Sequence, residues 1–537
     1  MTLVELMDDG MGTQATTRDD SSDVLKSLPQ RISDVIEPWT KHSPDRLALV
    51  ETAGSWTYRQ LASAVAEAKT WLADLGVRPG DRVMIVCENC RAFVGILLAL
   101  SELDAWPVLV NARLSAREVD QIRDHCGARR AIYTTSVSPH AREHAKRHGA
   151  TTQDIANLGS VSVGPLNADA APEPLDANCS NNVAALIYTS GTTGVPKGVM
   201  LTHRNLLFVA AVSARIRALA TDDRVYGVLP MSHAVGLSVV LLGALIRGAT
   251  LYLSPRFDPA AALEILEKHQ LTVVLGVPAM FAVLLDYAKT KGFETVNFPA
   301  LRIISSSGAP LDSALKMAVE KFFGLPLYNG YGVTECSPNI AQAKIDEPRK
   351  DTSVGRVFPG VEVKFVGLDR EAVGEGQAGE LWVRGPNVMK GYYRAPDETA
   401  AAIDGEGWFN TRDLARLEDG NLFVLGRTKE LIVRFGFNVY PAELEAVLNA
   451  HPGVVRSAVI GRSVKGIEGG EEIVAFVQPL LGLSPTVAEL EGHAARHLAP
   501  YKRPSQIILI PAMPLTPTGK VMKDELARMA RQTAVAR

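Results

Sequence analysis

Short apolar runs rich in β-branched residues recur through the first two thirds of the chain. Most of them are followed by a loop that contains glycine or proline, and then by a pattern typical of an amphipathic helix. The clearest runs are 183–189, 224–230, 249–254, 271–278 and 301–308. Strands that alternate with helices predict an α/β fold with doubly wound parallel sheets, in which ligands bind at loops beyond the carboxyl ends of the strands.

The pattern changes after about residue 350. Strand patterns at 360–367, 379–385 and 414–426 are separated by turns that contain glycine, which is typical of a small antiparallel or barrel-like unit. The segment that follows mixes helix and strand patterns and has the size of a small α+β domain. The chain is therefore predicted to have a large N-terminal domain of parallel sheets with a small β-barrel-like subdomain, and a small C-terminal domain.

The composition is that of a globular protein, with 47% hydrophobic and 21% charged residues among 537. A net charge of −3 lacks the basic footprint of a nucleic-acid partner. Five cysteines indicate reduced thiols rather than a disulfide framework. The start of the chain has no secretory signal pattern, and the apolar stretch near 235–246 is too short for a membrane span. We predict a cytoplasmic protein with a flexible tail over residues 1–25.

The segment 188–198 reads YTSGTTGVPKG and carries the clearest sign of chemistry. It lies between an apolar run and the helical pattern 203–219, so we expect a loop between a strand and a helix. Glycines let the backbone approach a ligand, and successive N–H groups and hydroxyls form a concavity that binds anions. Lys197 adds a positive charge. These features suit a polyphosphate, although the spacing is not that of a P-loop.

Three histidines, His140, His144 and His148, recur one helical turn apart within PHAREHAKRHGA. Such a ladder could bind a metal ion. Arginine and lysine are interleaved with it, and no cysteine or carboxylate converges on it. We therefore favour a solvated helix face.

Five motifs occur in order along the chain. They are YTSGTTGVPKGVMLTH (188–203), NGYGVTECS (329–337), WFNTRDLARL (408–417), GRTKELIVRFGFNVYPAELE (426–445) and PTGKVMKDEL (517–526). This series resembles the adenylate-forming superfamily, which includes acyl-CoA synthetases, aryl-CoA ligases, luciferase and the adenylation domains of peptide synthetases. The resemblance implies that a carboxylic acid is joined to the α-phosphate of ATP with release of pyrophosphate, and that coenzyme A then takes the acyl group and releases AMP.

The resemblance also implies a nucleotide site. Thr334 would contact the α-phosphate, Glu335 would hold Mg²⁺, Tyr331 would stack on adenine, and Asp413 would accept both ribose hydroxyls. The residues implied to bind ATP or AMP are Thr189, Ser190, Gly191, Thr192, Thr193, Gly194, Lys197, Ser307, Gly308, Ala309, Tyr331, Gly332, Thr334, Asp413, Arg427 and Lys520. One position departs from the family pattern, since Arg412 replaces the usual glycine before the aspartate. We expect its side chain to point outward.

Two half-reactions are implied to share this site. Lys520 would reach the acyl carboxylate and the α-phosphate during adenylation. A hinge at Lys429 would then rotate the mobile C-terminal domain, remove Lys520 and bring in Phe435 and Gly436, which would line a tunnel for the pantetheine of coenzyme A. The implied limits are 26–426 for the large domain, 427–429 for the hinge and 430–537 for the small domain.

The implied acyl pocket has small or apolar walls. Its residues are His233, Val235, Gly236, Val239, Gly308, Ala309, Gly332, Ser337 and Pro338, and the implied catalytic residues are His233, Thr334, Glu335 and Lys520. The run 232–246 has no lysine or arginine to pair a second carboxylate, and no aspartate near Thr334 could meet an ammonium group. We expect an uncharged acid, either aliphatic with a short or medium chain or aromatic.

An acid–CoA ligase that uses ATP, Mg²⁺ and coenzyme A is the favoured function. The alternative is a stand-alone adenylation enzyme that loads a carrier protein in trans, and a luciferase-like oxygenase shares the same motifs. A non-catalytic nucleotide-binding protein or scaffold would be expected to have lost catalytic positions. Glu335, Asp413, Arg427 and Lys520 are all present, which argues against that class.

Overall fold

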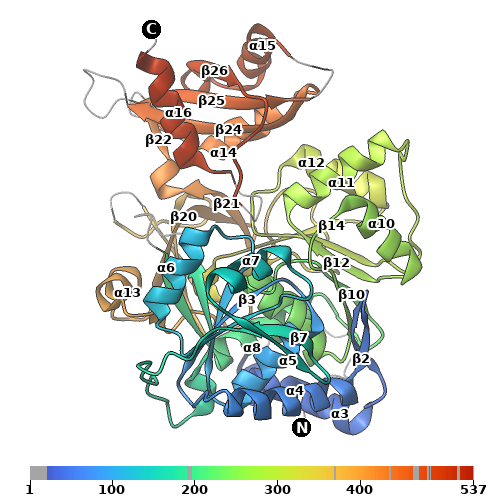
Figure 1. Cartoon of the computed structure of the whole chain (residues 1–537). Coiled ribbons are helices and arrows are strands. Elements are labelled where there is room, and N and C mark those ends of the chain that lie inside the picture. The colour runs from blue at the N-terminus through green and yellow to red at the C-terminus, as the bar shows by residue number, and fades with distance from the viewer. Residues whose placement is uncertain are drawn as a thin grey trace.

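Two large sheets with mostly parallel strands form the body of the chain (Figure 1). The computed structural model describes residues 21–189, 196–367, 370–434, 437–463, 471–480, 483, 485–516 and 521–535. Within these residues the first sheet has the order β16 (Arg356–Val357), β15 (Asn339–Gln342), β14 (Leu327–Gly332), β13 (Ile303–Ser306), β12 (Val273–Gly276), β10 (Arg224–Gly227), β11 (Thr250–Leu253), β1 (Leu47–Glu51) and β2 (Gly54–Thr57). The second has the order β19 (Gly391–Tyr392), β9 (Lys197–Thr202), β8 (Val183–Thr189), β4 (Trp106–Asn111), β3 (Arg82–Cys87), β5 (Arg130–Tyr133), β7 (Gly159–Val163) and β6 (Thr151–Ile155). The inner strands pair in parallel, as predicted.

Helices lie in three layers around the two sheets. The central layer, between the sheets, contains α4 (Tyr58–Asp74), α5 (Arg91–Glu102), α8 (His203–Ile216), the π-helix η3 (Val235–Leu242) and α9 (Gly243–Ile246). The outer layers contain α6 (Ala116–Cys126) and α7 (Pro139–Arg147) on the second sheet, and α10 (Pro259–Lys268), α11 (Pro278–Thr290) and α12 (Ser313–Phe323) on the first. The large domain is therefore a five-layer α/β structure, which confirms the predicted fold class.

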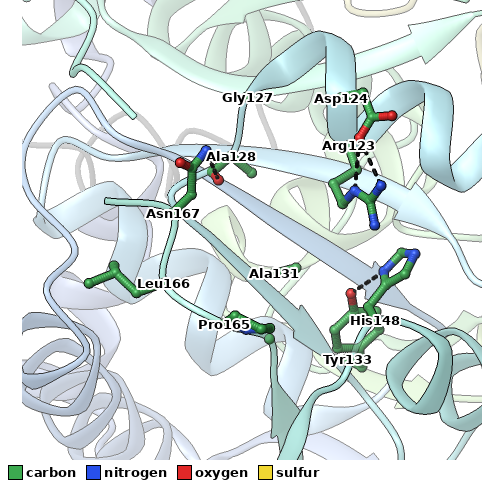
Figure 2. A pocket seen from close by; sticks show the side chains of 11 residues that line it. Arg123, Asp124, Gly127, Ala128, Ala131, Tyr133, His148, Pro165, Leu166 and Asn167 are labelled. Atoms are coloured by element: carbon green, nitrogen blue, oxygen red, sulfur yellow. Dashed lines mark hydrogen bonds and ion pairs between the residues drawn. The ribbon is translucent and has the colours of Figure 1, made fainter. Parts of the chain in front are cut away.

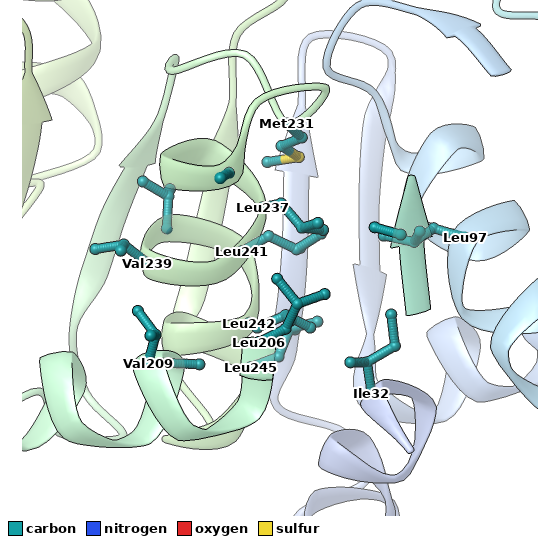
Figure 3. Close-up of a cluster of buried hydrophobic side chains, with 14 of the residues drawn as sticks. Ile32, Leu97, Leu206, Val209, Met231, Leu237, Val239, Leu241, Leu242 and Leu245 are labelled. Atoms are coloured by element: carbon teal, nitrogen blue, oxygen red, sulfur yellow. The ribbon is translucent and has the colours of Figure 1, made fainter. Parts of the chain in front are cut away.

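The central layer is the main hydrophobic core. Strand β3 shows how the sequence separates the layers, because Val83 and Ile85 face the central helices while Met84 and Val86 face α6 and α7. Figure 3 shows leucines of η3 and α8 on one side of this core and Leu97 of α5 on the other. Both faces of the central helices are covered by sheet, which explains why α5 is apolar nearly all round.

The predicted small antiparallel unit is a sheet of β17 (Glu362–Val366), β18 (Gly379–Arg384), β20 (Phe409–Glu418) and β21 (Asn421–Arg427). The chain then passes through η5 (Thr428–Glu430), β22 (Ile432–Arg434) and β23 (Phe437–Val439) into the C-terminal part, at the top of Figure 1. That part has a sheet of β24 (Val454–Ser463), β25 (Glu471–Pro479) and β26 (Gln506–Leu509), with α14 (Pro441–Asn449) and α15 (Val487–His497) on one face and α16 (Lys523–Val535) on the other.

The N-terminal segment is helical where it is described. Helix α2 (Ser21–Ser27) overlaps the last five residues of the predicted tail and contacts α8. It is followed by η1 (Ile32–Ile36) and α3 (Glu37–His42). Residues 1–20 lie outside the described residues. In the described part of the chain, no helix has the length and apolar character needed to cross a membrane.

The histidine ladder is not a solvated face, so that prediction is wrong. His144 is buried and its Nε2 lies 3.1 Å from the carbonyl oxygen of Ala112. His148 bridges the Tyr133 hydroxyl, 2.5 Å from its Nδ1, and an Asp120 oxygen, 2.8 Å from its Nε2. Figure 2 shows the Tyr133–His148 contact beside an open surface pocket of about 490 Å³. Helix α7 turns His144 inward, together with Ala141 and Ala145, while His140 on the same helix stays about half-exposed.

Asn89 joins the two large sheets directly behind the carboxyl end of β3. Its Nδ2 donates hydrogen bonds to the carbonyl oxygens of Gly227 (3.0 Å) and Leu229 (2.9 Å), and its Oδ1 accepts one from the Met231 N–H (2.9 Å). The Asn89 side chain is buried, as are these three backbone groups. Because Met231 lies two residues before His233, Asn89 also fixes the approach to the predicted acyl pocket.

We predict that Asn89→Leu lowers the free energy of unfolding by about 2–4 kcal/mol, because three buried backbone groups lose their partner. Urea unfolding of the full chain measures this. Asn157→Leu is the matched control, since Asn157 is exposed and bonds only to Glu67 in the described structure, and its change should stay within about 1 kcal/mol. Equal losses in the two variants would contradict this role for Asn89.

Candidate active site

The phosphate-loop motif closes a β-hairpin. Strands β8 and β9 are antiparallel, and Thr189 pairs with Lys197. The predicted loop between a strand and a helix is therefore wrong in one respect, because β9 comes before α8. Val199 and Leu201 alternate toward the core, which is a two-residue period that favours a strand. Thr189 and Lys197 lie opposite each other at the base of the loop.

Eight predicted site residues lie outside the described residues. They are Ser190, Gly191, Thr192, Thr193, Gly194, Phe435, Gly436 and Lys520.

Lys197 lies among side chains that the motifs do not include. Its ammonium group forms an ion pair with Glu398 of α13 (Pro396–Ala402) and stands 5.4 Å from the centre of the Tyr392 ring. Burial lowers the pKa of Lys197, and the positive charge of Arg412 lowers it further. The phosphate-loop lysine is thus paired with a carboxylate of α13 in the described structure.

Glu335 is fixed by the segment that contains β19. It lies in η4 (Thr334–Cys336), where its Oε1 accepts a hydrogen bond from the Tyr392 hydroxyl (2.9 Å) and its carbonyl oxygen accepts one from the Met389 N–H (2.8 Å). Burial and the charge of Glu335 raise the pKa of the Tyr392 phenol, so the phenol stays protonated and donates. Thr334 precedes Glu335 in the same turn and is half-buried.

The oxygen donors of this turn fit a magnesium ion. The described residues contain no group of three or more histidine, cysteine or acidic side chains that could hold a metal by themselves. Mg²⁺ typically takes one or two carboxylates from the protein and fills its other positions with phosphate oxygens and water. Glu335 is such a carboxylate, since one oxygen is oriented by Tyr392.

The predicted ribose and adenine residues lie together. Asp413 is 6% exposed, and its Oδ2 accepts a hydrogen bond of 2.6 Å from the Tyr331 hydroxyl. Its Oδ1 lies 3.5 Å from Nε of Arg427, which pairs with it across β20 and β21. Burial and the charge of Asp413 raise the pKa of the Tyr331 phenol, which therefore stays a donor. The structure brings these three side chains together, while their contacts with a nucleotide remain predictions.

A turn after β13 contains Ser307, Gly308 and Ala309, all half-buried. The Ser307 N–H donates to the carbonyl oxygen of Gly276, and Gly308 has a φ of +82°, a conformation that favours glycine. Ser307 packs beside Gly330, so the turn adjoins the strand that leads to Tyr331.

The predicted acyl-pocket wall includes the π-helix η3. This helix runs over eight residues, and π-helical turns are rare in proteins and frequent at functional sites. His233, just before η3, has its Nε2 3.4 Å from Nδ2 of Asn111 at the end of β4. Val235 is half-buried and Val239 is buried. The wall therefore joins both large sheets through the His233–Asn111 contact.

Two glycines of the predicted pocket are explained by backbone packing. A Cβ on Gly236 would lie 2.1 Å from the carbonyl oxygen of Pro230, and one on Gly332 would lie 1.9 Å from that of Pro338. Ser337 is fully buried, and its hydroxyl donates to the carbonyl oxygen of Asn387 (2.9 Å). The small size of these residues is thus required by the fold itself and does not report the size of the acid.

The predicted hinge residue Lys429 lies between two anchored neighbours. The Thr428 hydroxyl donates to Oε1 of Glu380 on β18, at 2.8 Å. Glu430 forms an ion pair of 3.0 Å with Lys523, at the start of α16. The residue before Lys429 is therefore tied to the large domain, and the residue after it to the C-terminal part.

Sequence reasoning missed Tyr392, Glu398 and Asn111. The segment KGYYRAPDE gives no local sign of a site. Tyr392 reaches the site because β19 pairs with β9, where Tyr392 lies opposite Val199. Only the register of a strand pair between distant segments identifies it.

Comparison with known proteins identifies the family to which the chain is similar. The family model described as AMP-binding enzyme matches residues 36–393, and the model described as AMP-binding enzyme C-terminal domain matches residues 443–520. Feruloyl-CoA synthase of Amycolatopsis sp. is 35% identical over 493 residues, which cover 90% of this chain and 96% of that protein. 4-Coumarate–CoA ligase 3 of Oryza sativa subsp. japonica is 34% identical over 499 residues, covering 89% of this chain and 88% of that protein.

A solved structure of similar shape is O-succinylbenzoate coenzyme A synthetase from Bacillus subtilis, in complex with ATP and magnesium ion. It is 29% identical, has a TM-score of 0.78, and covers 92% of this chain and 99% of its own.

We predict that Tyr392→Phe raises the Mg²⁺ concentration needed for half-maximal ATP-dependent activity by about tenfold, because Glu335 loses the hydrogen bond that orients it. Initial rates of AMP release at varied Mg²⁺ measure this. Tyr393→Phe is the matched control, because the Tyr393 hydroxyl donates to Glu173 at 2.5 Å instead. An unchanged Mg²⁺ requirement in Tyr392→Phe, or the same rise in both variants, would refute the positioning role.

Proposed function

Because the chain belongs to the AMP-binding enzyme family, and its relatives place it among the acid–CoA ligases of that family, we propose that it converts an uncharged carboxylic acid, ATP and coenzyme A into acyl-CoA, AMP and pyrophosphate. The observation that carries the proposal is the arrangement of two oriented carboxylates, Glu335 and Asp413, beside the cations Lys197 and Arg427. These groups come from four separate motifs and suit the parts of one bound nucleotide.

The first half-reaction joins two anions. An oxygen of the acid attacks the α-phosphorus of ATP, the bond from that phosphorus to the bridging oxygen breaks, and pyrophosphate leaves with the electron pair. Lys197 and Thr189 would bind the β- and γ-phosphates, Thr334 the α-phosphate, and Arg427 the ribose and phosphate. Mg²⁺ held by Glu335 would neutralise phosphate charge. Lys520, known here from its motif alone, would bring a mobile positive charge to the reacting carboxylate.

The second half-reaction transfers the acyl group to a thiol. The sulfur of coenzyme A attacks the acyl carbon, the bond from that carbon to the adenylate oxygen breaks, and AMP leaves. We propose that rotation at Lys429 exchanges Lys520 for the segment with Phe435 and Gly436 between the two steps. The anchors on both sides of Lys429 support this, because Thr428 is tied to Glu380 and Glu430 to Lys523. Backbone rotation is then concentrated at one residue.

The substrate is proposed to be an apolar aliphatic or aromatic acid. The π-helix supplies Val235 and Val239 as apolar wall residues, and its sequence has no cation for a second carboxylate. Relatives named for ferulate and 4-coumarate favour an aromatic acid within this range. An apolar wall discriminates by only about 1–3 kcal/mol per methylene, so several acids are expected to react. Loading of a carrier protein has no observation in its favour, whereas the relatives are CoA ligases.

We predict that purified protein with ATP, Mg²⁺ and coenzyme A makes acyl-CoA and AMP from apolar acids. The panel contains hexanoate, octanoate, benzoate, 4-coumarate, ferulate, malonate and phenylalanine, and mass spectrometry identifies the products with and without coenzyme A. Malonate and phenylalanine should react at least about tenfold more slowly, because the pocket offers no partner for their second charge. Acyl adenylate without a thioester would favour a carrier protein, and ADP as product would refute the proposed phosphate chemistry.

We predict that Lys520→Ala blocks adenylation but spares thioester formation from supplied acyl adenylate, and that Gly436→Trp does the reverse. Each half-reaction should fall by about 100-fold or more in the affected variant, since Lys520→Ala removes a charge needed only in the first step and Gly436→Trp obstructs the thiol path needed only in the second. Pyrophosphate exchange measures the first step and thioester release the second. Equal losses of both half-reactions in both variants would refute domain alternation.

A further inference from the structure

Arg217, which directly follows α8, is a buried cation that joins two helices of the central layer. Its side chain is 1% exposed. Its Nε donates to the carbonyl oxygen of Ser213 (3.1 Å), near the end of α8, and its Nη2 donates to that of Val239 (2.9 Å), within the π-helix η3. Its Nη1 has no hydrogen-bond partner among the described residues. One guanidinium thus ties the end of α8 to the middle of η3.

Stability alone gives little reason for an arginine at this position. Taking a charge out of water is costly, and an apolar residue of similar size is often at least as favourable in a buried place. Burial lowers the pKa of Arg217 to about 9, so the guanidinium is still charged at neutral pH. The carbonyl oxygens at the end of α8 carry a partial negative charge that compensates this cation only in part. The fold therefore keeps a costly cation beside η3.

The carbonyl oxygen of Val239 lies where the helix changes its hydrogen-bond spacing. The N–H of Gly243 donates to the carbonyl oxygen of Ser238, five residues earlier, and the helix then continues as α9 with a spacing of four. A change from five to four passes over one carbonyl oxygen, which here is that of Val239. Because a buried carbonyl group without a donor costs free energy, this turn needs a donor from outside the helix. Nη2 of Arg217 is that donor.

Two neighbouring residues of η3 are fixed to α8 in this way. The Ser238 hydroxyl donates to the carbonyl oxygen of Leu206 (2.9 Å), and Val239 accepts from Arg217. Gly243 leaves room for the guanidinium, since a Cβ there would lie 3.4 Å from Nη2. Val239 is also a wall residue of the proposed acid pocket. By holding the carbonyl group of this residue, Arg217 fixes the direction in which its side chain projects.

We propose that Arg217 helps to determine which acids fit the pocket, by holding the π-helical turn that positions Val239; this rests on the proposed function. Arg217 is a positioning residue, because it acts on the acid only through Val239. Without its hydrogen bond, we expect the turn to relax toward α-helical spacing. A π-helical turn closes one residue later than an α-helical turn, so this change rotates Val239 about the helix axis and reshapes the wall. The nucleotide residues lie on other elements and should stay in place.

The test measures kcat and KM of the full-length Arg217→Met variant for the apolar acids of the panel. Methionine fills much of the same space and removes both side-chain hydrogen bonds. We expect the KM for the best acid to rise about tenfold, and the ratio of kcat/KM between hexanoate and octanoate, or between benzoate and 4-coumarate, to change at least about fivefold. The KM for ATP should change less than about twofold. Arg217→Lys can still donate to Val239 and should change the ratio less than Arg217→Met.

Arg247→Met is the matched control. Arg247 directly follows α9 and is half-buried, and its Nε donates to the carbonyl oxygen of Leu219 (2.7 Å). It therefore loses the same kind of hydrogen bond outside η3, and its acid ratio should stay within about twofold of wild type. If Arg217→Met does not fold, Ser238→Ala is the second variant, because it releases the neighbouring contact of η3 with α8 without removing a charge. It should change the same ratio by at least about threefold.

The outcomes separate the two proposals. An unchanged acid ratio in the folded η3 variant, or an equal change in Arg247→Met, would overturn the role of Arg217 and leave the ligase proposal standing. A fall in kcat by the same factor for every acid, with unchanged KM, would also overturn this role, since a smaller folded fraction has that effect. Wild-type protein that converts no acid would overturn both proposals.

Discussion

Repulsion between an acid carboxylate and a triphosphate is the constraint on which the proposed site depends. The protein meets it with cations, but it must also keep its own carboxylates available beside them. Glu335 and Asp413 are each held by a tyrosine hydroxyl, Tyr392 and Tyr331. Burial and the neighbouring carboxylates raise the pKa of both phenols, so they remain neutral donors. A neutral donor orients a carboxylate without cancelling its charge, which leaves that charge for a cation or for ribose hydroxyls.

The same constraint requires segments far apart in the sequence to meet. The hairpin of β8 and β9 supplies Lys197, β14 leads to Glu335, and β20 and β21 supply Asp413 and Arg427. The segment with β19 connects the first two, because Tyr393 N–H donates to the carbonyl oxygen of Gly198 while Tyr392 contacts Glu335. Asn89 joins the two large sheets behind this edge. The site therefore depends on the pairing of β19 with β9 and on the packing of the two large sheets against each other.

The sequence predicted the fold class and named Tyr331, Asp413 and Arg427, which the structure brings together, while their contacts with a nucleotide stay predictions. It failed where the pairing of distant segments decides. Alternating strand and helix patterns identified the parallel sheets, because strands buried on both faces appear in the sequence as short continuous apolar runs. The short strand β9 was hidden within a motif rich in glycine, and His148 became internal only through Tyr133 and Asp120. Tyr392 could not be predicted, since its role depends on the pairing of β19 with β9. Gly236 fitted the pocket motif, yet backbone packing against Pro230 already explains it.

The central claim is that the acid attacks the α-phosphorus of ATP through its own oxygen. The most direct test uses the most active acid of the panel, labelled with ¹⁸O in both carboxylate oxygens, and follows the label by mass spectrometry after complete turnover with coenzyme A. The account predicts that one ¹⁸O atom appears in AMP and none in pyrophosphate, because the oxygen that attacks phosphorus stays with the adenylate when the thiol displaces it. Unlabelled AMP, or label in pyrophosphate or orthophosphate, would contradict the account.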